Sequence, residues 1–139
     1  MHNATEVRNR WSEYSDRVIR EKPLFIKKTR EYLFLSSFEQ LDIILEAYGF
    51  TAKQYTETDG SVTLSLNEID LIENGDTETN ARLAMGRAIL DYAEEYFNEF
   101  RFWNAAPNRK KHLPYILKAL IINDAKTLGD MLVCQVGNN

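Results

Sequence analysis

The sequence predicts an α+β protein of two parts. The first is a small N-terminal unit of two helices and two short strands, and the second combines a β-hairpin with three helices. Three observations support this prediction: apolar residues repeat at helical spacing in several segments, two short runs near the N terminus are apolar at every position, and Asp59-Gly60 forms a strong hairpin-turn signal. We place the boundary after Gly49, which gives domains of residues 1–49 and 50–139.

Composition favours a folded chain with one local basic segment. The 139 residues are 44% apolar and 12% aromatic, which is enough for a packed core. The formal net charge of −4 excludes a protein that coats nucleic acid uniformly. Residues 1–30 carry eight Lys or Arg against four Asp or Glu, a net charge of +4, so anion binding is expected only there.

The first helix is expected over roughly residues 6–20. Thr5 is a suitable N-cap, and Pro23 pushes the residue before it out of the helical region. The four residues 1–4 leave room for an edge strand. The apolar side chains of this helix fall on one face: Val7, Trp11, Tyr14, Val18 and Ile19.

Two strands follow, at residues 24–26 and 32–35, with a turn around Thr29-Arg30. Both runs are apolar at every position, whereas a strand with one solvent-exposed face would alternate apolar and polar residues. One helix can cover only one face of so small a sheet. The other face needs a second copy of the chain or the C-terminal half, and we therefore predict a homodimer.

The remaining helices show recognisable start signals. Ser37 with Gln40 three residues later has the capping-box pattern. Asp76 or Thr77 is expected to cap a long helix, and Asp124 a last short one. The long helix carries an unbroken apolar stripe: Ala81, Ala84, Met85, Ala88, Ile89, Tyr92, Ala93, Tyr96, Phe97 and Phe100.

The C-terminal half also shows turn signals. Asp59-Gly60 lies between residues 54–57 and 62–66, whose apolar alternation predicts a hairpin. A second turn is expected at Asn74-Gly75, before the long helix.

The order of the N-terminal elements resembles the N-terminal domain of Phd/YefM antitoxins. That family has a short strand, a helix opening on a Ser/Thr-Glu-Ala-Arg-like sequence, a strand of the Pro-Val-x-Ile-Thr-Lys type and a strand that ends in Ser and enters a helix. Here the matching pieces are TEVRNRWSEY, KPLFIKK and YLFLSS, within residues 1–45. The resemblance implies a dimeric antitoxin that represses its own operon and neutralises a small toxin, often a RelE-type RNase.

The resemblance also implies which residues bind DNA. The arginine that enters the operator groove falls on Arg8, and the basic residue that holds the phosphate backbone falls on Lys28. An arginine on the first turn of a helix can bind guanine in a bidentate manner, and nearby lysines can neutralise phosphates. We therefore predict Arg8, Lys27, Lys28 and Arg30 as the DNA-binding residues. A solvated polar face remains the alternative for these charges.

The C-terminal half, by its position, is the predicted toxin-binding part, with a folded surface. The alternative is an interaction protein that dimerises through the small sheet and sequesters a protein partner without binding DNA. Assembly beyond the dimer on DNA stays open. Trp103 beside Arg109, Lys110 and Lys111 could stack and hold RNA, although a core tryptophan beside a solvated basic turn explains the pattern more simply.

An enzyme is not expected. His112 and Cys134 are the one His/Cys pair that could act as a catalytic base and nucleophile. The pattern fits better with Cys134 as a small buried thiol and His112 as a residue at the start of a helix. No metal, nucleotide or cofactor motif occurs. A single cysteine fits a cytoplasmic protein, and no run resembles a signal peptide or a membrane-spanning helix.

Overall fold

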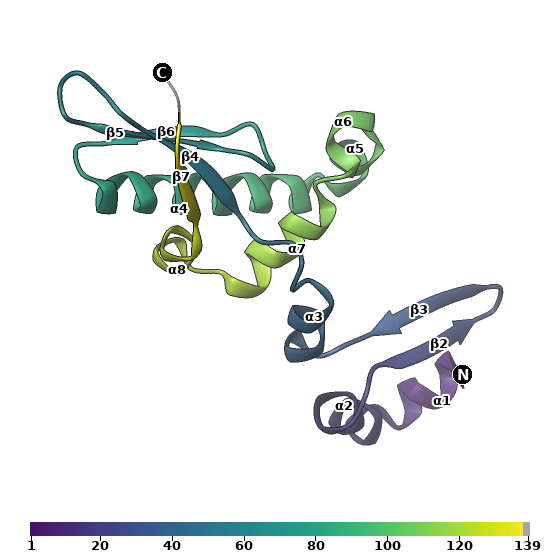
Figure 1. The fold of residues 1–139 in the computed structure, drawn as a ribbon. Helices are drawn as coiled ribbons and strands as arrows, with labels where there is room; N and C mark the ends of the chain where they lie inside the picture. The colour runs from purple at the N-terminus through teal and green to yellow at the C-terminus, as the bar shows by residue number, and fades with distance from the viewer. Residues whose placement is uncertain (138–139) are drawn as a thin grey trace. The chain divides into compact units, whose positions relative to one another are not determined.

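The computed structural model describes residues 1–137 and divides into two compact units, residues 1–46 and 47–139 (Figure 1). Helices and strands occur together in both units, so the α+β class predicted from the sequence is confirmed. None of the helices in the part of the chain that the structure describes is long and apolar enough to cross a membrane.

The first unit contains a three-stranded sheet in the order β1-β2-β3, in which β1 runs parallel and β3 antiparallel to β2. Two of its three helices precede β2 and the third follows β3. Their bounds are β1 His2–Asn3, α1 Ala4–Asn9, α2 Trp11–Arg20, β2 Leu24–Lys28, β3 Glu31–Leu35 and α3 Phe38–Ile44.

The prediction of one continuous first helix capped by Thr5 is wrong in two respects. The cap is Asn3, whose side-chain oxygen accepts the backbone N–H of Thr5 at 2.8 Å. The helix also breaks at Arg10, with φ −123° and ψ 37°. Because of this break, Tyr14 is buried in the core whereas Trp11 remains 53% exposed.

The helices of the first unit bury one apolar cluster on the sheet: Val7, Tyr14, Val18, Leu24 and Ile26. The predicted capping box of α3 is confirmed. The Ser37 hydroxyl accepts the Gln40 N–H, and the Gln40 side-chain oxygen accepts the Ser37 N–H, each at 3.2 Å. These two hydrogen bonds satisfy backbone N–H groups that would otherwise lack an acceptor at the start of the helix.

The second unit is built on a four-stranded sheet in the order β6-β5-β4-β7, with β7 parallel to β4. The predicted three helices correspond to α4, α7 and α8, and two short helices lie between the first two of these. The bounds are β4 Thr51–Thr56, β5 Val62–Leu66, β6 Ile72–Gly75, α4 Glu78–Asn98, α5 Phe100–Ala105, α6 Pro107–Lys110, α7 Leu113–Ile122, α8 Ala125–Met131 and β7 Val133–Val136.

The predicted hairpin is confirmed, with Gly60 in the left-handed region at φ +86°. The predicted turn at Asn74-Gly75 is wrong, because both residues belong to β6. Gly75 instead permits close approach of α4, since a Cβ atom there would lie 2.3 Å from the backbone nitrogen of Ala81. Strand β7 was not predicted.

Helix α4 lies along the sheet and packs against α8, so that it forms the centre of the second core (Figure 1). Its predicted cap is confirmed, because the Thr77 hydroxyl accepts the Asn80 N–H at 3.1 Å. Asp124 caps α8 in the same way at Thr127, as predicted. Arg82 then joins the two helices, since its Nη1 donates to the carbonyls of Gly129 (3.1 Å) and Leu132 (2.8 Å) at the end of α8.

Candidate nucleic-acid interface

The pairing of β1 with β2 places the start of α1 beside the end of β2. Asn3 lies opposite Lys27 in the parallel register, and α1 begins at the next residue. The two-residue turn after Lys28 brings the chain back into β3. Arg8 comes from the last turn of α1, not from the first turn of a helix as predicted, because α1 begins at Ala4 and ends at Asn9. The lysines come from the end of β2, and the fold gathers them with Arg8 on one side of the first unit.

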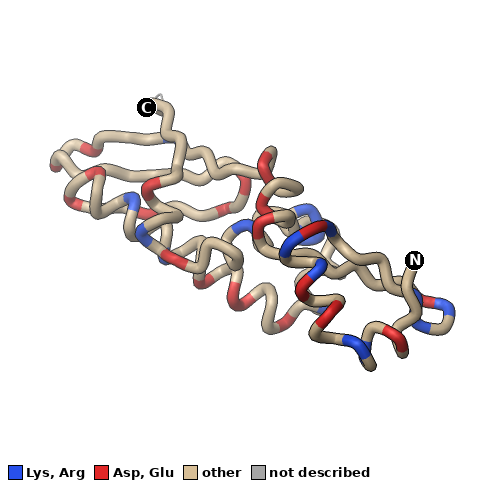
Figure 2. The backbone as a smooth tube through the Cα atoms, turned by 90° about the horizontal axis from the view of Figure 1, so that it is seen from below, with Lys and Arg blue, Asp and Glu red and all other residues tan. Residues whose placement is uncertain are grey.

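These residues line a polar groove of about 620 Å³. Arg8, Lys27 and Lys28, three of the four residues predicted to bind DNA, are among the lining side chains, and all three are exposed. Arg30 lies in the same turn but is not part of the lining. Figure 2 shows basic residues gathered at the turn between β2 and β3, beside the N terminus. The sequence analysis did not anticipate the contribution of the other lining residues: Asn3, Ala4, Thr5, Thr29 and Leu33.

The cations of the groove differ from the other arginines of the first unit in how they are paired. Arg10 contacts Glu13 at 2.6 Å and Glu6 at 3.5 Å, and Arg17 contacts Glu13 at 2.6 Å. Hydrogen bonding to Arg10 lowers the pKa of Glu13. Within residues 1–137, none of the four predicted DNA-binding residues has an ion-pair partner. Their charges are therefore available to an anion.

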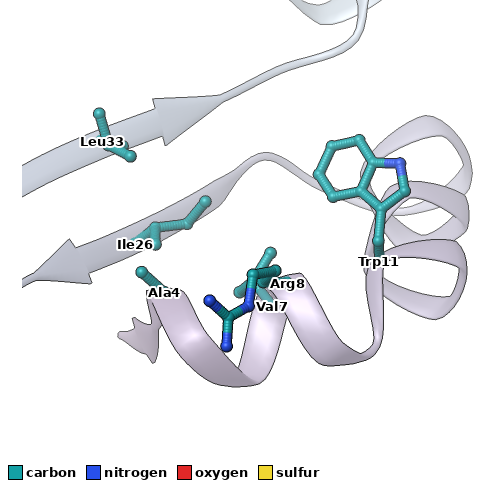
Figure 3. A pocket seen from close by; sticks show the side chains of 6 residues that line it. All are labelled: Ala4, Val7, Arg8, Trp11, Ile26 and Leu33. Carbon is teal, nitrogen blue, oxygen red and sulfur yellow. The ribbon is translucent and has the colours of Figure 1, made fainter.

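An apolar groove of about 390 Å³ continues from the polar one, since both are lined by Ala4, Arg8 and Leu33. Figure 3 shows Ile26 and Leu33 on the two strands and Ala4, Val7 and Arg8 on α1, with Trp11 at one end. Leu33 is 52% exposed although it stands opposite the buried Ile26. An apolar surface of this kind is typical of a protein–protein contact.

The opposite face of the small sheet is also apolar and exposed. Phe25 and Phe34 pair across the strands with ring centroids 5.1 Å apart, and each is at least half exposed. Tyr32, 62% exposed, stands next to them on β3. Phe38 and Ile43 of α3 are exposed as well. Within the first unit itself, residues 1–46, no helix covers this face of the sheet.

The second unit holds a separate polar hollow of about 330 Å³, lined by Asn67, Glu68, Asp70, Asn108, Arg109, Lys111 and His112. His112 is buried, and its Nδ1 lies 2.8 Å from the Tyr92 hydroxyl. Burial, then the charges of Arg109 and Lys111, lower the pKa of His112, while Asp70 opposes them.

The two residues of the His/Cys pair considered from the sequence lie in different surroundings, with His112 lining the polar hollow and Cys134 on β7. Burial raises the pKa of the Cys134 thiol on β7, which disfavours the reactive thiolate. Trp103 packs against Tyr96 and Phe102, and the Arg109 guanidinium lies 5.6 Å from its ring, so this tryptophan is a packing residue. Among residues 1–137, no group of three or more His, Cys, Asp or Glu side chains is placed to hold a metal ion.

Comparison with known proteins identifies the class. A family profile described as "Antitoxin of toxin-antitoxin, RelE / RelB, TA system" matches residues 1–133. A crystal structure from Syntrophomonas wolfei subsp. wolfei, of the antitoxin part of a proposed toxin/antitoxin system, is 32% identical, with 98% of each chain covered and a TM-score of 0.89. No curated protein matches the chain.

The fold and these matches together define an antitoxin of a toxin–antitoxin system. The chain belongs to the Phd-like family of RelE/RelB antitoxins, which confirms the resemblance found in the sequence. Membership of this family implies a toxin as partner and indicates a regulator rather than an enzyme.

Proposed function

We propose that this antitoxin is a homodimeric autorepressor that acts in the cytoplasm, where its operator DNA lies. In this proposal residues 1–49 dimerise and bind the operator through Arg8, Lys27, Lys28 and Arg30. Residues 50–139 form the domain that binds and neutralises a RelE-type RNase toxin. Pairing of dimers on adjacent DNA sites is compatible with this arrangement.

The unpaired cations around the polar groove are the observation that carries the proposal. Carboxylates neutralise Arg10 and Arg17 on the neighbouring helix surface, but not Arg8, Lys27 or Lys28. Lysines at the end of a strand can hold a phosphate backbone, and an arginine beside them can reach a base edge. Binding of this kind releases counterions from the DNA and therefore weakens as salt increases.

The exposed apolar surfaces of the first unit support a dimer. Exposed apolar patches often mark protein–protein contacts, and the exposed Phe25–Phe34 pair lies on the face opposite α1 and α2. A second copy could cover this face with its own equivalent surface, as a two-fold interface requires. The dimer would also present two basic grooves, which matches the repeated half-sites of a typical operator.

A protein that dimerises and sequesters its partner without reading DNA is the alternative. One observation favours it: residues 1–46 carry eight Lys or Arg and eight Asp or Glu, so the net charge of the unit is zero. Under this alternative the groove charges only solvate the surface, and repression of the operon is absent.

Two matched variants separate these functions. Arg8→Ala and Arg20→Ala each remove one exposed arginine, but only Arg8 lines the groove. Titrated against the DNA upstream of the gene, Arg8→Ala should bind at least about 10-fold more weakly than the unaltered protein, because a base contact is lost. Arg20→Ala should bind nearly as well as the unaltered protein. Equal losses in both variants would contradict the assignment of the groove, and no binding by the unaltered protein would favour the alternative.

A further inference from the structure

The polar hollow of the second unit is lined by opposite charges that come from two separate segments. Glu68 and Asp70 belong to the connection between β5 and β6, whereas Arg109 and Lys111 belong to α6 and the residue after it. Two carboxylates and two cations give the lining a formal net charge of zero. Within residues 1–137, these four side chains form no ion pair with one another. Both kinds of charge are therefore available to a molecule in the hollow.

The acidic segment is held in place by Thr51 on β4. The Thr51 backbone N–H donates to Glu68 Oε1 at 2.8 Å, and the Thr51 hydroxyl donates to Glu68 Oε2. Asn67 Nδ2 donates to Thr51 Oγ1 at 2.9 Å, and the side chain of Ile69 is buried in the core. In the part of the chain that the structure describes, the exposed Asp70 carboxylate has no hydrogen-bond or ion-pair partner. Asp70 is therefore the carboxylate best able to bind a cationic group.

The basic segment is held by aromatic side chains of α4. Arg109 Nη1 donates to the Tyr92 hydroxyl at 3.3 Å, and the guanidinium lies 5.7 Å from the centroid of the Tyr92 ring. The Tyr96 hydroxyl donates to the Arg109 carbonyl oxygen at 2.9 Å. A cation that is already fixed in this way loses little side-chain entropy when a ligand binds.

His112 adds a directed hydrogen-bond donor to the same hollow. Its Nδ1 lies 2.8 Å from the Tyr92 hydroxyl, whose oxygen already accepts from Arg109. The hydroxyl proton is therefore donated to Nδ1, which leaves the proton of the neutral ring on Nε2. Burial lowers the pKa of His112 and favours this neutral form.

The Nε2 atom of His112 is open to the hollow. His112 is only 6% exposed, and its one side-chain hydrogen bond is made by Nδ1. Among residues 1–137, Trp103 Nε1 is the one fully buried side-chain nitrogen or oxygen that lacks a partner, so His112 Nε2 is not sealed inside the core. Since His112 lines the hollow, its Nε2–H is a donor that only a molecule in the hollow can satisfy.

We propose that this hollow binds a free amino acid as its zwitterion. The α-carboxylate of the ligand accepts hydrogen bonds from Arg109, Lys111 and His112 Nε2. Its α-ammonium group donates to Asp70. Charge-assisted hydrogen bonds of this kind are shorter and stronger than neutral ones. A simple anion is a poorer ligand because it would meet the two carboxylates of the lining, and a simple cation is poorer because it would meet the arginine and the lysine.

The size and the remaining lining narrow the class of amino acid. The hollow holds about 330 Å³, at the lower end of the range for small-molecule sites. Asn67 and Asn108 add uncharged amide groups to the lining. A small, uncharged polar side chain fits these groups, as in serine, threonine, asparagine or glutamine. This site does not rest on operator or toxin binding.

Isothermal titration calorimetry of the full-length protein with these four amino acids tests the site. At least one should bind, and its N-acetyl and amide derivatives, each of which lacks one of the two charges, should bind at least about 10-fold more weakly. Lys111→Gln and Asp70→Asn should each weaken binding about 10-fold, because each removes one charged partner. Asp70→Asn should also bind the N-acetyl derivative as well as it binds the amino acid, which a general loss of structure would not produce.

Two matched controls remove the same kinds of charge outside the hollow. Lys110→Gln and Asp91→Asn change exposed residues that are not part of the lining, and both variants should bind as the unaltered protein does. Thermal unfolding checks that every variant is folded, and Lys111→Gln tests the site even if Asp70→Asn unfolds.

Four results would overturn the proposal. The first is that none of the amino acids binds the unaltered protein. The second is an N-acetyl derivative that binds as tightly as the amino acid, since the hollow would then take a simple anion. The third is an amide derivative that does so, which would assign the hollow to a simple cation. The fourth is unchanged binding in both Lys111→Gln and Asp70→Asn, since the amino acid would then lie elsewhere.

Discussion

Gly86→Ala is expected to destabilise the second unit, although alanine is the better helix former. Gly86 lies in the middle of α4, where it faces α8. Replacement of a helical glycine by alanine normally stabilises a helix by about 1 kcal/mol. The close contact between the two helices reverses this expectation, because the added methyl group has no space.

The magnitude follows from the distances. A Cβ atom on Gly86 would lie 1.9 Å from the carbonyl oxygen of Ala125 and 2.9 Å from the backbone nitrogen of Gly129. Both are backbone atoms, so no side-chain rotation can relieve the overlap, and α8 must move away from α4. Overpacking of a core typically costs about 1–3 kcal/mol. Since the movement also strains the two Arg82 hydrogen bonds to the end of α8, we take the upper end of this range, about 3 kcal/mol, which leaves a net loss of about 2 kcal/mol after the helix gain is subtracted.

Thermal unfolding, monitored by circular dichroism, measures this loss of stability. A loss of this size should lower the unfolding temperature by roughly 8–16 °C for a unit of this length. Gly49→Ala is the matched control, because no atom lies within 4 Å of the position of its Cβ atom and its φ is negative. An unfolding temperature for Gly86→Ala equal to or above that of the unaltered protein would refute the proposed contact between α4 and α8.

Two further predictions concern the turn between β2 and β3 and the buried histidine. Thr29 in that turn has φ +58°, which is strained for a β-branched residue. Thr29→Asn should therefore raise the free energy of unfolding of the first unit by about 0.5–1 kcal/mol, measured by denaturant unfolding, and a decrease would contradict this. The pKa of His112 is lowered in the folded state, so the unfolded state takes up its proton first, and unfolding free energy should fall as pH drops below the ordinary value of 6.5. His112→Gln should flatten this part of the pH dependence, and an unchanged profile would mean that other groups cause it.

Local signals predicted much of the secondary structure. Ser37, Thr77 and Asp124 cap their helices because each offers a side-chain oxygen to open backbone donors, which the sequence alone reveals. Asp59-Gly60 makes its turn because glycine adopts a positive φ without strain.

Features that depend on distant parts of the chain were not predictable in this way. Strand β7 forms by parallel pairing with β4, about 80 residues earlier, and only the β-branched Val133 and Val136 hinted at it. Asn74-Gly75 looks like a turn, but glycine is needed there for the approach of α4. The break at Arg10 separates two helices whose apolar periodicity reads as one.

The candidate site was partly visible in the sequence. Arg8 and Lys28 were assigned through the family resemblance, and β1 pairing with β2 brings them to one groove. The apolar continuation of the groove was not predicted, because the pattern placed Trp11 in the core, whereas the break at Arg10 leaves it exposed.

The central claim, that this antitoxin reads its own operator, is tested most directly by one titration. Purified protein is titrated against the DNA upstream of its gene and against unrelated DNA of equal length, at two salt concentrations. The account predicts tight binding to the upstream DNA that persists at the higher salt, while binding to the unrelated DNA becomes far weaker. Equally weak binding to both, abolished by salt, would contradict it.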